Sequence, residues 1–157
     1  MIQRIQTVWL LLAGVTIFAL FLFPYLQYID VAGIGRKLLV SGSYTAVNGE
    51  SVKEESFILQ SIATVVLGLI PVYIIFKFKD RKMQIKLILL QMVLVVLFFF
   101  WLYSFSGDIL SKTSQYLSAS NIGVGFFLFP VAIVFLSLAF GGIRKDERLI
   151  KSAERLR

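Results

Sequence analysis

The stretch that decides the fold is Leu87–Ser106, which reads LILLQMVLVVLFFFWLYSFS and contains no Lys, Arg, Asp or Glu. A helix rises about 1.5 Å per residue, so this stretch is about as long as the ~30 Å hydrocarbon core of a bilayer is thick. Three further runs share its character: Val8–Ile29, Phe57–Phe76 and Ile122–Ile143. The sequence therefore predicts an all-α integral membrane protein, a single domain built as a bundle of four transmembrane helices.

The amino-acid composition supports this fold class and excludes several kinds of catalytic and metal site. Hydrophobic residues make up 58% of the chain, above the share of about 45–50% in soluble domains. The chain has no cysteine and no histidine, which excludes thiol exchange, thiolate or imidazole metal sites and a Ser-His-Asp triad within it. We expect no enzyme activity, no cofactor and no metal. A carboxylate site at the inner surface, using Asp80, Asp146 and Glu147, is the remaining enzymatic alternative.

The basic residues lie unevenly between the runs. Twelve of the 16 precede the first run or lie in residues 77–86 and 144–157, whereas four lie in residues 30–56 and 107–121. Lys and Arg in short loops stay on the cytoplasmic side, so we expect both termini and the loop 77–86 in the cytoplasm. We interpret the net charge of +7 as a consequence of this topology, and the basic residues would also attract anionic lipid headgroups. We expect no nucleic-acid partner.

The two external loops differ in character. Residues 30–56 contain a strand-prone stretch, Lys37–Val47, which Ser41-Gly42-Ser43 interrupts and Asn48-Gly49 follows. Both are turn-forming groups, so this loop is either a small β-hairpin over the outer end of the bundle or an irregular loop. The loop 107–121 is shorter and rich in serine. We expect the first run to be a retained span, because it is longer than the apolar core of a signal peptide.

Polar and small residues inside the runs are candidates for contacts within the bundle. Gln60, Ser61 and Thr64 fall in one helical sector together with Gly68 and Pro71. Small and hydroxylated residues on one face let helices approach closely and hydrogen-bond. Packing within the bundle is the interpretation that we favour, and a substrate path along this face is the alternative.

The third and fourth runs carry comparable residues. Gln91 lies about 20 Å from Gln60 along the membrane normal, so we expect the two amides to have separate hydrogen-bond partners. Ser137 and Gly141 repeat, on the fourth run, the spacing of small residues seen at Thr64 and Gly68. The runs contain no charged side chain, which disfavours a proton-coupled exporter or an ion pathway.

The carboxyl-terminal tail, residues 144–157, is predicted to be an amphipathic basic helix. Arg144, Arg148, Lys151 and Arg155 share one helix face, and Glu147 and Lys151 have the spacing of a favourable ion pair. Gly141-Gly142 would let the tail leave the fourth span and lie among the lipid headgroups. Asp146 falls near the apolar face, which suggests a specific ionic partner, either Arg4 or the loop 77–86.

The two ends of the chain carry a resemblance to a known family. Residues 1–10, MIQRIQTVWL, and residues 143–157, IRKDERLIKSAERLR, resemble the ends of a family of small integral membrane proteins of Bacteroidota, domain of unknown function 4293. The resemblance implies an inner-membrane protein with four helices and carries over no catalytic residue. It directs attention to the ends, where these residues are candidates for contact with a partner or lipid: Gln3, Arg4, Arg144, Lys145, Asp146, Glu147, Arg148, Lys151 and Arg155.

Two functions follow as hypotheses. The first is a non-enzymatic accessory or scaffold subunit that contacts other membrane machinery through its basic cytoplasmic face and its external loop. The second is a small oligomeric transporter, channel or lipid-handling protein for a neutral cargo, with these residues along its path: Gln60, Ser61, Thr64 and Gln91. In either case we expect anionic lipids and another membrane protein, or further copies of this chain, as partners.

Overall fold

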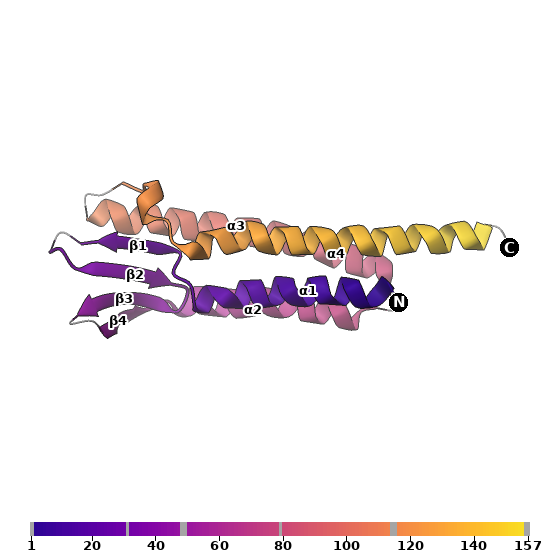
Figure 1. The fold of residues 1–157 in the computed structure, drawn as a ribbon, viewed down its shortest axis with the longest axis horizontal. Coiled ribbons are helices and arrows are strands. Elements are labelled where there is room, and N and C mark those ends of the chain that lie inside the picture. The colour runs from indigo at the N-terminus through magenta and orange to yellow at the C-terminus, as the bar shows by residue number, and fades with distance from the viewer. Residues whose placement is uncertain (1, 31, 48–49, 79, 114–115, 156–157) are drawn as a thin grey trace.

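Four helices run alternately up and down along one axis, and a four-stranded sheet lies at one end of them (Figure 1). The structure is a computed structural model. It describes residues 2–30, 32–47, 50–78, 80–113 and 116–155. Within these ranges it describes only the backbone of residues 2–4, 47, 50, 150–151 and 153–155. In chain order the elements are α1 (Ile2–Phe18), the short 3-10 helix η1 (Ala19–Phe21), β1 (Leu26–Ile29), β2 (Gly35–Leu39), β3 (Gly42–Val47), β4 (Glu50–Ser56), α2 (Ile58–Phe76), α3 (Arg81–Lys112), the 3-10 helix η2 (Ala119–Asn121) and α4 (Val124–Arg155).

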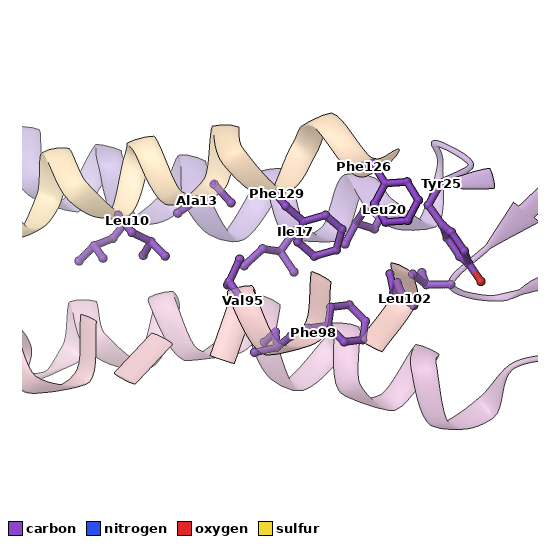
Figure 2. Packing of buried hydrophobic residues seen from close by; sticks show 14 of the residues in the cluster. Leu10, Ala13, Ile17, Leu20, Tyr25, Val95, Phe98, Leu102, Phe126 and Phe129 are labelled. Carbon is purple, nitrogen blue, oxygen red and sulfur yellow. The ribbon is translucent and has the colours of Figure 1, made fainter. Parts of the chain in front are cut away.

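The core of the bundle follows one face of α1. Leu10, Ala13 and Ile17 recur at intervals of three and four residues, the period of a helix face, and all three are buried. The helix α1 packs against α2 and α4, and α3 closes the ring by packing against the same two helices. Figure 2 shows Val95 of α3 and Phe129 of α4 pointing into the same interior.

The outer surface of the bundle is apolar as well. Large hydrophobic side chains such as Leu69, Val93 and Phe127 are more than half exposed, which in water would be costly over so many residues. Among the described residues, three helices are long and apolar enough to cross a membrane: α2, α3 and the Val124–Leu149 part of α4. A bundle that is apolar inside and outside fits a membrane protein.

The first expected span is wrong at its outer end. The helix α1 ends at Phe18, η1 follows, and β1 begins at Leu26, so α1 is shorter than the run 8–29 and falls below the length of the three spans. Pro24 accounts for part of this, since proline lacks the N–H that a helix interior needs and disfavours helix in the residue before it. Within β1, Leu26 and Tyr28 are buried whereas Gln27 and Ile29 are exposed, which is the alternation of a strand.

The all-α class is also wrong, because the first external loop forms a sheet. Its strands pair in the order β1-β2-β3-β4, all antiparallel, where the sequence predicts at most a hairpin. The predicted turn at Ser41-Gly42-Ser43 lies close to the observed one, since Leu39 of β2 pairs with Gly42 of β3. The missed strands are β1, hidden at the end of an apolar run, and β4, whose described side chains are all exposed and so give no alternation.

The second external loop closes onto the sheet. Ile122 forms an isolated antiparallel bridge with Leu26 at the free edge of β1. The backbone N–H of Gly123 donates to the Tyr25 carbonyl at 2.8 Å. This contact ties the residue before α4 to the residue before β1, so the start of the β1 edge is covered while β4 remains the outer edge.

Candidate functional site

The end of the bundle opposite the sheet gathers most of the basic residues. Both termini lie at this end (Figure 1), together with the connection from α2 to α3. The basic side chains that the structure describes there are Lys77, Arg81, Lys82, Lys86, Arg144, Lys145 and Arg148. The tail and the loop 77–86 therefore lie at the same end of the molecule, which we call the basic end.

The helix α4 continues past the rest of the bundle at the basic end. It runs without interruption from Val124 to Arg155, and Figure 1 shows its last turns extending beyond the start of α1. The expected bend at Gly141-Gly142 is therefore absent: the tail is helical, as predicted, but it continues along the bundle axis. Glycine permits a bend without requiring one, and here Gly142 serves a packing contact instead.

That contact is a buried polar pair between α1 and α4. The Gln6 Nε2 atom donates to Asp146 Oδ2 at 2.8 Å, and both residues are only 8% exposed. A Cβ atom on Gly142 would come within 2.9 Å of the Gln6 side chain, so the absence of a side chain at position 142 makes room for the amide. The pair fixes the first turns of α1 against the point where α4 leaves the bundle.

The sequence suggested an ionic partner for Asp146, either Arg4 or the loop 77–86, and the Arg4 side chain lies outside the described part of the chain. The partner that the structure gives Asp146 is the neutral amide of Gln6. Gln6 was not singled out as a candidate residue, although it precedes Leu10, Ala13 and Ile17 at the same helical spacing, which places it on the buried face of α1. A polar residue on such a face requires a hydrogen-bond partner.

The exposed face of α4 at the basic end is cationic. Arg144, Lys145 and Arg148 are all exposed, and the Arg144 guanidinium lies 5.9 Å from the centre of the Phe140 ring. A shallow depression here is lined by residues of α4 alone, so it is a helix face and not a cleft between elements. Glu147, beside this face, is partly buried and takes part in a contact. The side chains of Gln3, Arg4, Lys151 and Arg155 lie outside the described part of the chain.

The polar residues near the outer end of α2 bond to the sheet side of the molecule. The Tyr25 hydroxyl donates to Gln60 Oε1 at 3.2 Å, and Ser61 Oγ donates to the Val40 carbonyl at 2.9 Å. The Thr64 hydroxyl donates to the Gln60 carbonyl within the helix. Gln60 and Ser61 thus attach α2 to the residue before β1 and to the turn between β2 and β3.

Gln91 has a different and more specific role. Pro71 cannot donate to the carbonyl of Leu67, four residues before it, because proline has no backbone N–H. Gln91 Nε2, from α3, donates to that carbonyl at 2.9 Å, so it supplies the hydrogen bond that proline removes. Gln84, in the first turns of α3, donates at 2.9 Å to the Ile74 carbonyl near the end of α2, which also accepts from the Lys77 N–H. Gln60 and Gln91 thus have separate partners.

The small residues at Thr64 and Gly68 of α2 lie at a helix contact, whereas those at Ser137 and Gly141 of α4 do not. A Cβ atom on Gly68 would lie 2.7 Å from the Phe18 ring, so α1 approaches α2 closely there, as the spacing of Thr64 and Gly68 predicts. Ser137 and Gly141 are exposed, so within this chain the corresponding pair on α4 makes no such interface.

The sheet carries an ion-pair network at the opposite end. Arg36 bonds Asp30 at 3.0 Å and Glu54 at 2.9 Å, which links the segment after β1 to β2 and β4. Burial raises the pKa of the neighbouring Tyr28 phenol, and the positive charge of Arg36 opposes that rise. We interpret this network as structural, because Arg36 contacts both carboxylates across the sheet.

The comparison with known proteins rests on the chain as a whole. No curated protein matches it. A family model matches residues 2–156, which is almost the full length and includes α1, the sheet and the projecting end of α4. The chain belongs to the family described as Domain of unknown function (DUF4293).

Proposed function

We propose that this protein is a multi-pass protein of the bacterial inner membrane that acts as a non-enzymatic accessory or scaffold subunit. Its partner would be another membrane protein, bound at the basic end and at the sheet. The observation that carries the proposal is the uninterrupted course of α4 through Val124–Arg155. A helix of this length measures about 48 Å and so exceeds the ~30 Å hydrocarbon core, which leaves its basic end free to meet a partner.

The distribution of charge supports an orientation with both termini in the cytoplasm. The basic end carries an excess of Lys and Arg, whereas acidic residues such as Asp30, Glu54 and Asp108 lie toward the sheet end. Short basic segments remain on the cytoplasmic side of a membrane. The helix α1 lies alongside α2 and α4 (Figure 1), so in this proposal it crosses the membrane with them. Anionic headgroups would then surround the basic end.

The hydrogen bonds inside the bundle favour an accessory role over a polar transport path. Gln60, Ser61, Thr64 and Gln91 each bond to a neighbouring group of the chain. Side chains that are committed to such contacts stabilise helix packing, and a cargo would have to break them.

Charge reversal on the projecting helix tests the proposal. We would purify the tagged full-length protein in a mild detergent from its native membrane and identify bound proteins by mass spectrometry. The variant Arg144→Glu with Arg148→Glu should lose a stoichiometric partner that the unchanged protein retains, because two attractive charges become repulsive. The variant Arg144→Lys with Arg148→Lys, which keeps both positive charges at the same exposed positions, is the matched control and should retain that partner.

Two results would overturn the accessory role. One is a partner that remains bound at full stoichiometry to the doubly reversed helix. The other is purification of the unchanged protein with no other membrane protein bound. Insertion of each variant is checked by its recovery in the membrane fraction, so loss of a partner is distinguished from loss of the protein.

A further inference from the structure

An apolar groove of about 420 Å³ lies between α3 and α4. Val96, Phe99 and Tyr103 line it from α3, and Phe126, Pro130 and Ile133 line it from α4. Each set follows the three- and four-residue spacing of one helix face, so the groove is formed by two facing stripes. Val96 is 39% exposed and Tyr103 is 48% exposed, so the groove opens to the outer surface of the bundle.

The surroundings of this groove determine what can fill it. Both stripes lie inside helices that are long and apolar enough to cross a membrane, so the groove continues the lipid-facing surface. Water in a cavity needs two to four polar partners, and the lining offers almost none beyond the Tyr103 hydroxyl. Empty apolar space is costly because the lining atoms lose their contacts. The occupant must therefore be a hydrocarbon group.

The shape of the lining distinguishes a lipid chain from a helix of a second copy. Helices in membranes approach one another through Gly, Ala, Ser or Thr, and the lining contains none of these residues. Aromatic rings form part of it instead: Phe99 contacts Phe126 with ring centres 5.4 Å apart and Phe129 with ring centres 5.5 Å apart. Large rings keep a second helix at a distance but leave room for a thin, flexible chain.

We propose that this groove binds one acyl chain of a membrane phospholipid. The site selects the chain and not the headgroup, because the lining carries no charged side chain. It is independent of the accessory role, since the groove lies in the spans and the basic end of α4 does not contribute to it.

Photolabelling of the unchanged protein tests this site. The protein is reconstituted into vesicles of phosphatidylethanolamine and phosphatidylglycerol that contain phosphatidylcholine with a diazirine at the end of one acyl chain. After illumination, mass spectrometry compares adducts on the groove stripes with adducts on the outward residues Ile62 and Val66 of α2. These control residues are 55% and 52% exposed, more than Val96, so labelling in proportion to exposure would favour α2.

We expect adducts to be about tenfold more frequent on the groove stripes, which corresponds to a preference of about 1.4 kcal/mol over bulk lipid. The variant Val96→Trp should fill the groove and abolish this preference, whereas Val66→Trp on α2 should preserve it. Labelling of α2 that equals or exceeds labelling of the groove would overturn the proposal without requiring any variant to fold.

Discussion

The bundle and the sheet hold their polar side chains in different environments. In the bundle, Gln6 meets Asp146 and Gln91 meets a backbone carbonyl, and each of these three residues is at most 8% exposed. In the sheet, the Arg36 side chain is 29% exposed and the carboxylate of Glu54 is 40% exposed. The two regions thus use contacts of similar length with very different access to water.

This difference predicts how each region responds when a partner is removed. A buried group that loses its partner bears the full cost of desolvation, because no water can replace the lost hydrogen bond. An exposed ion pair contributes little, since water and salt already compete with it. Equal substitutions in the two regions should therefore have unequal effects on the free energy of unfolding.

The largest effect is expected at the pair between α1 and α4. Gln6→Leu leaves the Asp146 carboxylate buried without its amide partner and should lower the free energy of unfolding by about 3 kcal/mol, the upper part of the range for an unsatisfied buried group. The measurement is reversible unfolding of the purified protein in mixed detergent micelles, followed by circular dichroism.

A double variant separates the contact from simple packing. Asp146→Leu combined with Gln6→Leu removes both polar groups, and such replacement of a whole pair is nearly neutral in other proteins. The double variant should regain most of the stability lost by Gln6→Leu. Equal stability of Gln6→Leu and the unchanged protein would show that the comparison between the two regions is wrong.

A smaller effect is expected at Gln91, and it should depend on Pro71. Gln91→Leu leaves the Leu67 carbonyl without a donor and should cost about 1 kcal/mol, in the range for hydrogen bonds between membrane helices. Pro71→Ala restores a backbone N–H to that carbonyl. In the Pro71→Ala background, the Gln91→Leu substitution should then cost little or nothing.

The two single variants and the double variant form a thermodynamic cycle that isolates this coupling. The same unfolding measurement applies to each. Costs of Gln91→Leu that are identical with proline and with alanine at position 71 would mean that the hydrogen bond to Leu67 does not replace the one that proline removes. Gln84→Leu removes the hydrogen bond from α3 to the Ile74 carbonyl near the end of α2. It provides a comparison in which proline plays no part.

The helical part of the molecule was largely accessible from the sequence. The observed bounds of α2, Ile58–Phe76, nearly coincide with the expected run 57–76, because a membrane helix must be apolar for its whole length. The partner of Gln91 could not be predicted, since it is a backbone group on another helix. Gln6 was within reach, because its spacing from Leu10 and Ala13 already placed it on the buried face of α1.

Two strands of the sheet, β1 and β4, could not be predicted from the sequence. A strand at the end of an apolar run, as at Leu26–Ile29, has the composition of a membrane helix. An edge strand such as β4, whose side chains at residues 51–56 are all exposed, has the composition of a loop, because charged residues protect a sheet edge from pairing. Both strands depend on register with their neighbours, and register is a property of the folded chain.

The smallest effect is expected in that sheet. Glu54→Gln removes one of the two ion pairs of Arg36 while Asp30 keeps the other, so the free energy of unfolding should fall by at most about 0.5 kcal/mol. Added salt should reduce even that difference, since exposed charges are screened. Glu55→Gln, at the neighbouring exposed carboxylate, is the matched control. A loss at Glu54 as large as that at Gln6 would mean that the ion pairs of the sheet contribute as much to stability as the buried pair of the bundle, and that they hold β2 and β4 in place on either side of β3.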